Sequence, residues 1–472
     1  MREFVKHIHF VGIGGIGMSG IAEVLLDLGF RVSGSDQAES PRLAALREAG
    51  AQTFVGHHRD QVLGADAVVT SSAVDSKNPE ILGAEEQKIP IVPRAEMLGE
   101  LMRFKKGIAI AGTHGKTTTT SLIAGVLVEA QMDPTFIVGG VVNSVSTNAR
   151  LGSGEFLVAE ADESDASFLH LQPQMAVVTN IDEDHMETYL GDFERMKKAY
   201  VDFLHNLPFY GLAILCFDDP VVRQLASQIT KPVVSYGFEE GVDFRATNLT
   251  QDGATSYFQV EGKNMQASEF CVAMPGRHNV LNALAAISIG CLLGVPEDAI
   301  KRALANFQGI GRRFERLGEV KIPAGSVELI DDYAHHPREL AATLTAARDC
   351  WPEKRLMVVF QPHRYSRTRD LFDDFAQLLS GVENLVVTEV YPAGEAPIPG
   401  ADGRALCKAI RKRGFDPIFV DDLEELRNLL SSILHDDDVV LTLGAGSIGR
   451  FAQTVKKEGL DNGPPNSSGG EI

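Results

Sequence analysis

Three observations predict that this chain is an α/β protein with three domains. First, its 472 residues are more than one hydrophobic core usually holds, and chains of this length commonly divide into about three domains. Second, short apolar strands alternate with helical segments along most of the chain, as in parallel sheets covered by helices. Third, each part of the chain contains an apolar strand that runs into a glycine-rich turn and then a helix. The same strand–turn–helix device therefore occurs in all three predicted domains.

The first predicted domain, residues 1–105, begins with such a strand, turn and helix. Its turn holds Gly12, Gly14 and Gly17, which complete a G-x-G-x-x-G fingerprint. The next strand ends at Asp36, where a dinucleotide-binding fold places its ribose contact. A turn of this kind brings backbone N–H groups and a helix N-terminus close to a phosphate. The pattern predicts a Rossmann-like domain.

The second predicted domain, residues 106–312, opens with a strand that leads into the turn GTHGKT. Gly112 and Gly115 let backbone N–H groups approach an anion, Lys116 can reach the β- and γ-phosphates, and the Thr117 hydroxyl can hold Mg²⁺. The full Walker spacing is not met, because an isoleucine stands where its first glycine would be. The alternative is an ordinary helix N-terminus with a nearby lysine. The strand before the turn and the apolar helix after it favour a phosphate cradle of the P-loop ATPase type on a mainly parallel sheet.

Two further strands of the second domain end in groups that can bind a cation. Glu160 heads an acidic run directly after one strand, and His185 follows the next strand along the chain. A hard cation beside phosphates needs oxygen ligands, and a carboxylate at a strand end is a usual supplier. The alternatives are a solvated acidic loop and a histidine on the surface or in the core. Together with Thr117, these positions would meet at one edge of the sheet.

The rest of the chain is expected to follow the same α/β rhythm, with one exception. The segment 233–274 alternates polar and apolar residues between turns, which indicates an antiparallel patch, and a helix at 279–293 then closes the second domain. The third domain, residues 313–458, is predicted to be Rossmann-like and contains the glycine-rich turn 444–449. Residues 459–472 have little to bury and are predicted to be a disordered tail.

Polar side chains also gather near strand ends of the third domain. An arginine can reach a phosphate or hold a carboxylate with two parallel hydrogen bonds, although it can equally pair with one of the many acidic residues. Two histidines that are neighbours in sequence point apart, which favours hydrogen-bonding roles over a metal site. These candidates are Arg313, Asp332, Tyr333, His335, His363, Arg364 and Arg367.

Composition and charge limit the classes of partner. The net charge of −20 argues against nucleic acid or an anionic membrane as the main partner, and no apolar run approaches the ~20 residues of a membrane span. The five cysteines lack CxxC spacing, so neither a zinc site nor a disulfide framework is predicted. The N-terminus leads straight into a strand without an export signal, which predicts a cytoplasmic protein. Its partners are expected to be small molecules.

Read as a set, the motifs resemble those of the Mur ligases of peptidoglycan synthesis. They occur in order along the chain: GIGGIGMSG, GSD, GTHGKTTT, AEADESD, EDHMETY, GRHN, GRRFE, DDYAHHP, HRYSRT and GAGS. Among these ligases, the chain is most similar to those that join L-alanine to UDP-N-acetylmuramate. The resemblance implies ATP and Mg²⁺ as cofactors, a UDP-sugar site in the first domain, ATP in the second and the amino acid in the third. A monomer–dimer equilibrium is also expected. Since a UDP-sugar carries a pyrophosphate, the first glycine turn does not require a dinucleotide.

The resemblance also implies roles for individual residues. ATP would bind to Gly112, Thr113, His114, Gly115, Lys116, Thr117, Thr118, His278, Asn279, Asn282, Arg313 and Asp332. The UDP-sugar would bind to Gly14, Gly15, Gly17, Met18, Ser19, Asp36, His57 and Ser71. The amino acid would bind to Tyr333, His335, His363, Arg364 and Arg367. Metal ions would bind to Thr117, Glu160 and His185, and the catalytic residues would be Lys116, His185, Arg313 and His335.

Three other functions compete with this interpretation. A recycling ligase that adds a tripeptide to the same UDP-sugar shares the GTHGKT and HHP motifs, but GIGGIGMSG and HRYSRT favour the alanine enzyme. A nicotinamide-dependent oxidoreductase would explain Gly12, Gly14, Gly17 and Asp36 but leaves the second cradle without a purpose. A nucleotide-switched binding protein without chemistry has no support beyond the cradle itself.

Overall fold

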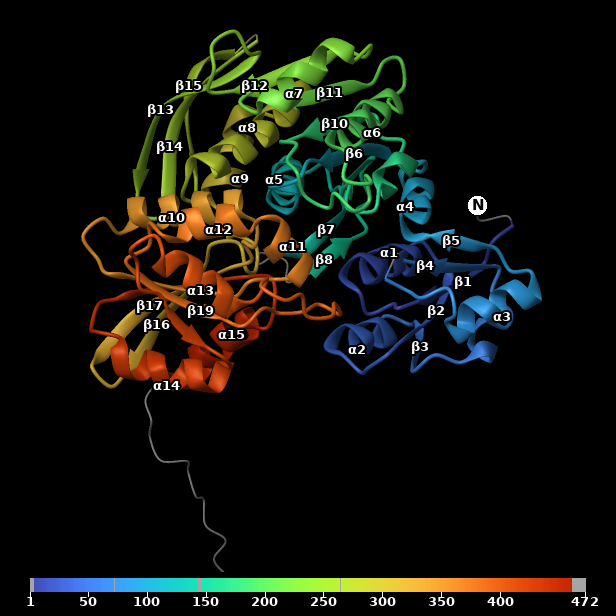
Figure 1. Ribbon diagram of the computed structural model, residues 1–472. Helices are drawn as coiled ribbons and strands as arrows, with labels where there is room; N and C mark the ends of the chain where they lie inside the picture. Colours follow the sequence, from blue (N-terminus) through green and yellow to red (C-terminus); the bar gives the residue numbers. More distant parts are fainter. Residues whose placement is uncertain (1–3, 72, 143–146, 264, 461–472) are drawn as a thin grey trace, which may run out of the picture. The chain divides into compact units, whose positions relative to one another are not determined.

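The computed structural model describes residues 4–71, 73–142, 147–263 and 265–460. It contains three sheets (Figure 1) and divides into two compact units. The first unit extends to Gln308 and the second begins at Gly309, except that 251–256 and 274–277 belong to the second. Most of the first two predicted domains lies in the first unit, and the bounds of the predicted domains stay a prediction.

The N-terminal sheet has the strand order β3-β2-β1-β4-β5, and all of its neighbouring strands run parallel. Its strands are β1 (His7–Val11), β2 (Arg31–Asp36), β3 (Gln52–Val55), β4 (Ala67–Thr70) and β5 (Ile91–Pro93). The helical segments are α1 (Ile16–Asp27), α2 (Pro41–Glu48), η1 (Arg59–Val62), α3 (Pro79–Gln87) and α4 (Arg94–Met102). The chain leaves β1 towards β2 on one side and later returns to β4 on the other. Sheets of this kind bind ligands where the order reverses, at the carboxyl ends of the strands, and the Rossmann-like prediction is confirmed.

The central sheet has the order β15-β14-β13-β12-β11-β10-β6-β9-β7-β8. Its strands are β6 (Lys106–Ala111), β7 (Thr135–Val142), β8 (Thr147–Arg150), β9 (Phe156–Glu160), β10 (Met175–Val178), β11 (Leu212–Cys216), β12 (Val233–Gly237), β13 (Phe244–Asp252), β14 (Thr255–Gly262) and β15 (Met265–Val272). The helical segments are α5 (Lys116–Glu129), η2 (Ser167–His170), α6 (Phe193–His205), α7 (Pro220–Leu225), η3 (Ala226–Gln228), α8 (Arg277–Leu292) and α9 (Glu297–Ala305). The pairs among β6 and β9 to β12 are parallel, as predicted.

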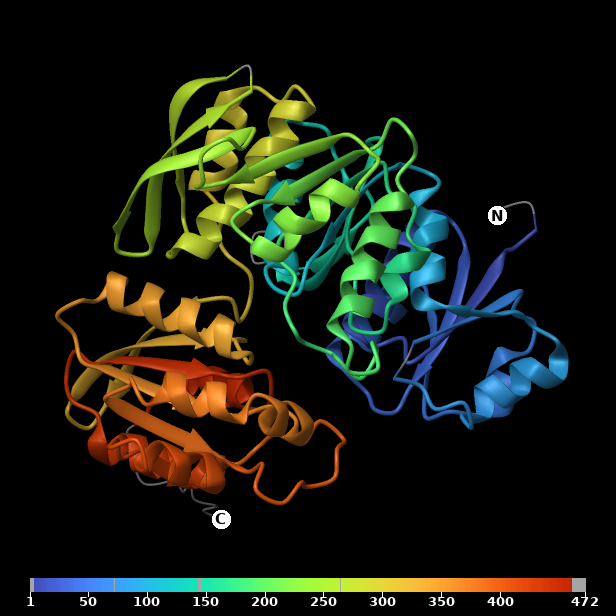
Figure 2. The same cartoon turned by 45° about the horizontal axis from the view of Figure 1, so that its top comes forward.

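The predicted antiparallel patch is a set of hairpins formed by β13, β14 and β15, visible in Figure 2 as the long yellow-green strands. Their two-residue connections allow only antiparallel pairing. The patch starts later than expected, because β12 continues the parallel sheet and pairs parallel with β13. The helix predicted at 279–293 corresponds to α8, but it does not close the domain. Gly294 has a φ of 73° and ends the helix, and α9 follows Pro296.

The sheet of the second unit has the order β16-β17-β21-β18-β19-β20. Its strands are β16 (Glu315–Ile322), β17 (Gly325–Asp332), β18 (Leu356–Phe360), β19 (Asn384–Thr388), β20 (Ile418–Val420) and β21 (Val439–Leu443). The helices are α10 (Pro337–Cys350), α11 (Tyr365–Asp370), α12 (Phe372–Leu379), α13 (Gly403–Arg411), α14 (Leu423–Ile433) and α15 (Ile448–Glu458). The prediction missed β16, an antiparallel edge strand in which polar residues interrupt the apolar ones.

The predicted disordered tail starts too early. Gly459 and Leu460 are part of the fold, because Leu460 is buried in the core and its N–H donates to the Lys321 carbonyl at 2.9 Å. Residues 461–472 lie outside the described residues. Leu460, the last residue that the structure describes, therefore packs beside β16.

Candidate active site

The turn between β6 and α5 has the geometry of a phosphate cradle. Gly112 and Gly115 have φ angles of 132° and 82°, in the left-handed region that favours glycine. Neither position has room for a side chain. An added Cβ at Gly112 would collide with the Thr179 hydroxyl, and one at Gly115 would lie 2.6 Å from Asn282 Oδ1. Glycine is thus required at both positions, which leaves the N-terminus of α5 open to a close approach by an anion.

The residues that follow β10 hold this turn in place. The His114 N–H donates to Asn180 Oδ1 at 2.8 Å, and Asn180 Nδ2 donates to the His114 carbonyl at 2.9 Å. The Asp182 N–H donates to the Thr113 hydroxyl at 2.9 Å, and His114 Nε2 lies 3.3 Å from Asp182 Oδ2. The sequence analysis gave Asn180 and Asp182 no role. The available signal was their position at the end of the strand beside β6.

Lys116, at the start of α5, forms an ion pair with the buried Glu163. Its Nζ lies 2.8 Å from Glu163 Oε1, and it donates to the carbonyls of Gly112 and Thr113 at 2.6 and 3.1 Å. Burial raises the pKa of Glu163 to about 7, although Lys116 acts in the opposite direction. Burial alone would lower the pKa of Lys116, but the carboxylates of Glu163 and Asp162 raise it. The lysine therefore stays charged. Glu163 Oε2 is buried and has no hydrogen-bond partner among the described residues.

The order of the strands supports the predicted metal-binding edge. β6 lies between β9 and β10, and all three run parallel. Glu160 ends β9 opposite Ile110 of β6, Thr117 is buried in the first turn of α5, and His185 follows β10. The Gly139 N–H donates to Glu160 Oε1 at 2.7 Å. A hydroxyl in the first turn of α5 and a carboxylate at the end of the neighbouring strand β9 are the kinds of oxygen donor that Mg²⁺ prefers.

Helix α8 brings two of its predicted ATP-binding residues to the cradle. Asn282 Oδ1 accepts a hydrogen bond from the Thr119 hydroxyl at 3.1 Å, and Asn282 Nδ2 donates to Asn279 Oδ1 at 3.2 Å. Both asparagines are buried, whereas His278 is partly exposed at the start of the helix. Thr118 is buried beside Thr119 in α5. Asn282 therefore contacts α5 directly and is held by Asn279. A residue that only capped α8 would not need this contact.

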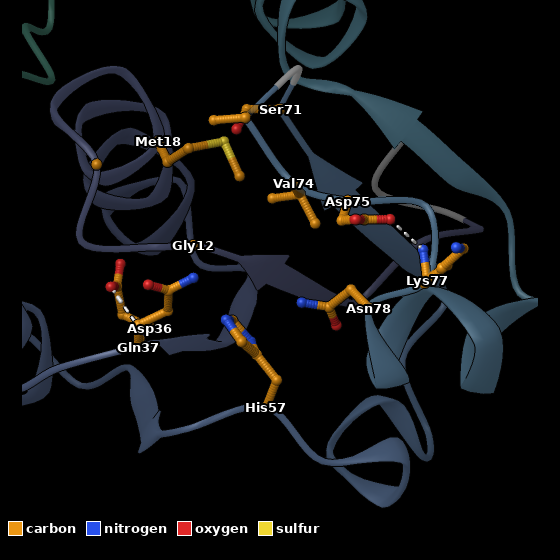
Figure 3. A pocket seen from close by; sticks show the side chains of 12 residues that line it. Gly12, Met18, Asp36, Gln37, His57, Ser71, Val74, Asp75, Lys77 and Asn78 are labelled. Carbon is orange, nitrogen blue, oxygen red and sulfur yellow. Dashed lines mark hydrogen bonds between the residues drawn. The ribbon is translucent and has the colours of Figure 1, made fainter. Parts of the chain in front are cut away.

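A cavity of about 470 Å³ opens at the carboxyl edge of the N-terminal sheet (Figure 3). Five of the eight residues predicted to bind the UDP-sugar line it, namely Gly15, Met18, Asp36, His57 and Ser71. Gly14, Gly17 and Ser19 do not line it, and Ser19 is fully buried. The other polar lining residues, Gln37, Asp75, Lys77 and Asn78, were not predicted from the sequence. They follow β2 and β4, the strands on either side of β1.

Contacts within the protein occupy part of the first glycine turn. The Gly14 N–H donates to Asp36 Oδ2 at 2.9 Å, so this carboxylate holds the turn. An added Cβ at Gly17 would lie 2.8 Å from Arg94 Nη1, and Arg94 Nη2 lies 3.2 Å from Asp162 Oδ2. The sequence analysis did not identify Arg94. Its guanidinium adds a positive charge beside the N-terminus of α1, where an anion is already favoured.

Four of the predicted residues in the second unit form one cluster. The rings of Tyr333 and His335 are 5.3 Å apart, and those of His335 and His363 are 5.9 Å apart. Arg367 Nη1 lies 3.3 Å from His363 Nδ1, and Tyr391, which was not predicted, stacks on His363. Burial, with the neighbouring His335 and Arg367, lowers the pKa of His363 to about 3. His363 is therefore neutral at physiological pH.

The Arg364 side chain points towards Glu395 and not towards the cluster around His363. Its Nη1 lies 3.9 Å from Glu395 Oε1, and its side chain is 44% exposed, whereas Arg367 is buried. Arg313 lies over the Tyr333 ring at 5.1 Å. The Asp332 carboxylate is buried and accepts the N–H groups of Phe314 and Ala334, each at 2.7 Å. Burial raises the pKa of Asp332 to about 6. Of the two arginines predicted in the HRYSRT motif, Arg367 belongs to the cluster and Arg364 does not.

The third glycine-rich turn is filled by side chains of the protein. An added Cβ at Gly446 would lie 2.5 Å from Gln361 Oε1 and 2.6 Å from Tyr391 Cβ. The Arg312 guanidinium packs against Gly449 and donates to the Gly444 carbonyl. The Ile448 N–H donates to Gln361 Oε1 at 3.0 Å. In this turn the glycines serve close packing of strand, helix and side chain.

The comparisons with known proteins assign the fold to a class. Three family models match consecutive parts of the chain: "Mur ligase family, catalytic domain" at 7–106, "Mur ligase middle domain" at 110–290 and "Mur ligase, glutamate ligase domain" at 312–446. The chain belongs to the Mur ligase family. It is therefore an ATP-dependent ligase, which confirms the predicted class of enzyme and the three-domain α/β fold.

Individual members of the family show which kind of Mur ligase the chain is most similar to. The chain is 59% identical to the UDP-N-acetylmuramate–L-alanine ligase of Halorhodospira halophila, over 94% of this chain and 92% of the relative. The UDP-N-acetylmuramate-alanine ligase structure from Thermotoga maritima is 32% identical, with a TM-score of 0.80 over 96% of this chain and 98% of that one. A murein peptide ligase from Psychrobacter arcticus shares the fold at 23% identity, with a TM-score of 0.69 over 97% and 99% of the two chains.

None of the described helices combines the length and the apolar character needed to cross a membrane.

Membership of a ligase family removes the nicotinamide-dependent alternative, which rested on the first glycine turn and Asp36. The hydrogen bond from Gly14 to Asp36 gives this aspartate a structural role in the turn.

Proposed function

We propose that this chain joins L-alanine to the lactyl carboxylate of UDP-N-acetylmuramate at the expense of ATP. The observation that carries the proposal is 59% identity, over nearly the whole chain, to a ligase of that name. The turn at 112–117 would bind ATP, and the cavity beside β1 would bind the UDP-sugar. The recycling ligase that adds a tripeptide remains the second candidate, since a murein peptide ligase shares the fold. The monomer–dimer equilibrium stays a prediction.

The reaction requires activation of a carboxylate, which is a poor electrophile. The γ-phosphoryl group of ATP passes to the lactyl carboxylate, giving an acyl phosphate and ADP. The alanine amine, after loss of a proton, attacks the acyl carbon, and phosphate leaves. Transition-state charge gathers on the transferred phosphoryl group, so preorganised cations should contribute most of the catalysis.

The residues of the cradle would supply the groups that this transfer needs. Lys116 carries a positive charge at the N-terminus of α5, and Asn180 and Asp182 hold the turn that would bind the phosphates. Mg²⁺ would be held by Thr117 and Glu160, with His185 at a second ion, and it would neutralise charge between the two anions. Asn279 and Asn282 would contact the adenosine.

A panel of amino acids tests the proposal. The protein is incubated with ATP, Mg²⁺, UDP-N-acetylmuramate and one amino acid at a time, and ADP and the product are identified by mass. We expect ADP and an amide product with L-alanine. Product with the tripeptide L-alanyl-γ-D-glutamyl-meso-diaminopimelate but none with L-alanine would establish the recycling ligase instead.

The amino-acid cluster gives a second prediction. Arg367→Lys should raise the KM for L-alanine at least about tenfold, the equivalent of ~1.4 kcal/mol, with the KM for ATP little changed. A planar guanidinium can make two parallel hydrogen bonds to the alanine carboxylate, and an ammonium cannot. Arg364→Lys is the matched control, because Arg364 pairs with Glu395. Steady-state kinetics on both variants give the KM values for L-alanine and ATP. A larger alanine effect in Arg364→Lys would show that this assignment is wrong.

A further inference from the structure

A buried polar network lies beneath the cavity of the N-terminal sheet, and its centre is Glu80 in the first turn of α3. This carboxylate is fully buried. Its Oε2 accepts a hydrogen bond from the Ser35 hydroxyl at 2.5 Å and lies 2.9 Å from His57 Nδ1. Its Oε1 lies 3.2 Å from His9 Nε2. Burial would raise the pKa of Glu80, but the hydrogen bonds from His9 and Ser35 hold it below its usual value. Glu80 is therefore ionised.

An ionised carboxylate only accepts hydrogen bonds, so the ring nitrogens that face it must carry hydrogen. This condition places a hydrogen on His57 Nδ1 and another on His9 Nε2. The Ser35 oxygen lies 2.9 Å from His57 Nδ1, and this contact is consistent with a hydrogen on Nδ1. Its own hydrogen goes to Glu80, so towards His57 it acts as an acceptor.

The other half of the network determines where the compensating charge lies. His7 Nδ1 lies 2.8 Å from the Gly64 carbonyl, which can only accept, so this nitrogen also carries hydrogen. The Ser33 hydroxyl lies 2.8 Å from both His7 Nε2 and His9 Nδ1. The hydroxyl has one hydrogen and can donate it to only one of these two nitrogens. If both rings were neutral, the lone pair of the other nitrogen would face a lone pair of the Ser33 oxygen. An additional proton on one ring removes this conflict.

The additional proton belongs on His9. Burial lowers the pKa of His7, whereas His9 faces the Glu80 carboxylate directly. A charged His9 also balances the buried negative charge, which would be costly without a partner. With Glu80 neutralised by His9, His57 is left as a neutral ring that carries its hydrogen on Nδ1.

The remaining nitrogen of His57 faces the ligand site. His57 lines the cavity, and Figure 3 shows its ring pointing into it. In the part of the chain that the structure describes, no group forms a hydrogen bond with Nε2. This nitrogen offers a lone pair, so it binds a group that brings its own hydrogen. Phosphate oxygens at neutral pH do not.

We propose that Glu80 is a positioning residue of the sugar-nucleotide site, which fixes His57 as the Nδ1–H tautomer and so makes Nε2 a hydrogen-bond acceptor for a donor of the ligand. The donor is either the imide N–H of the uracil base or a sugar hydroxyl. The inference rests on the proposed function for the identity of the ligand. The tautomer itself does not depend on that function.

The wild-type protein allows a direct test of the tautomer. The full chain is labelled with ¹⁵N-histidine, and the His57 signals are assigned by their loss in His57→Gln. We expect a hydrogen on Nδ1 and a lone pair on Nε2 at neutral pH without ligand. A hydrogen on Nε2 would overturn the proposal, whatever reaction the protein catalyses.

The variant Glu80→Ala tests the consequence for binding. Alanine removes both acceptor oxygens, so the Ser35 hydroxyl can donate to His57 Nδ1 and the hydrogen is no longer held on that nitrogen. We expect the KM and Kd for UDP-N-acetylmuramate to rise about tenfold, while kcat and the KM for ATP change less than twofold. Glu85→Ala, on the exposed face of the same helix, is the matched control and should leave all four unchanged.

Two further measurements separate positioning from a purely structural role and identify the donor. Ser35→Ala keeps the carboxylate and should give a smaller rise of the same kind. A folded Glu80→Ala protein with an unchanged Kd for the sugar nucleotide would overturn the proposal, as would an equal loss for ATP. If the imide is the donor, a ligand methylated at uracil N3 should bind wild type about tenfold more weakly than the unmethylated ligand does, and it should bind Glu80→Ala and wild type equally well. If the donor is a hydroxyl, methylation should leave the Glu80→Ala effect intact.

Discussion

Replacing Lys116 with alanine should reduce turnover more than about a thousandfold. An ammonium that faces the transferred phosphoryl group contributes several kcal/mol to the transition state, and each ~1.4 kcal/mol is a factor of ten in rate. The Kd for UDP-N-acetylmuramate should stay nearly unchanged, because its proposed cavity lies on a different sheet. Single-turnover formation of ADP measures the rate, and calorimetry measures the binding.

This variant needs a control for stability, because it leaves the buried Glu163 without its partner. An unpaired buried charge is destabilising by roughly 3–5 kcal/mol. The double variant Lys116→Ala/Glu163→Gln removes that charge and should recover stability without recovering turnover. A tenth of the wild-type rate in either variant would show that the cradle has been assigned wrongly.

Glu160→Gln should have the next largest effect. The amide keeps the shape of the side chain and can still accept the Gly139 N–H, but it loses the charge that holds a hard cation. We expect the Mg²⁺ concentration needed for half-maximal rate to rise at least about tenfold and kcat to fall about a hundredfold. Asp165→Asn is the matched control in the same acidic run, because Asp165 accepts the Ser167 N–H within its own loop. An unchanged Mg²⁺ dependence in Glu160→Gln would exclude Glu160 as a ligand.

The sequence could predict the features that depend on neighbouring residues. The cradle was predictable because its strand, glycines, lysine and helix are contiguous, and the strand order then placed Glu160 beside β6. Glu163, Asn180 and Arg94 were missed because each acts through a partner far away in sequence: Lys116, His114 and Asp162. No local pattern marks such pairs.

Two features of the second unit could not be predicted from the spacing of its motifs. The third glycine turn has the same spacing as the first, yet Gln361, Tyr391 and Arg312 fill it. Spacing describes how the backbone turns, and the side chains that approach from other strands decide whether a ligand fits. Similarly, Arg364 and Arg367 stand close together in one motif. Only the backbone, with a φ of 69° at Arg364, directs one towards Glu395 and the other towards His363.

The network around Glu80 illustrates what a sequence cannot supply. His7, His9 and His57 are separate histidines in the sequence, and Glu80 is one of many carboxylates. Their hydrogen-bond directions follow only when the carbonyl of Gly64 and the hydroxyls of Ser33 and Ser35 are placed among them.

The most direct test of the central claim is the fate of carboxylate oxygen. UDP-N-acetylmuramate labelled with ¹⁸O in the lactyl carboxylate is converted with ATP and L-alanine, and the products are analysed by mass. Transfer of the γ-phosphoryl group to the carboxylate predicts ADP, one ¹⁸O atom in the released phosphate and the other in the amide. Label retained wholly outside the phosphate, or release of AMP and pyrophosphate, would contradict the account.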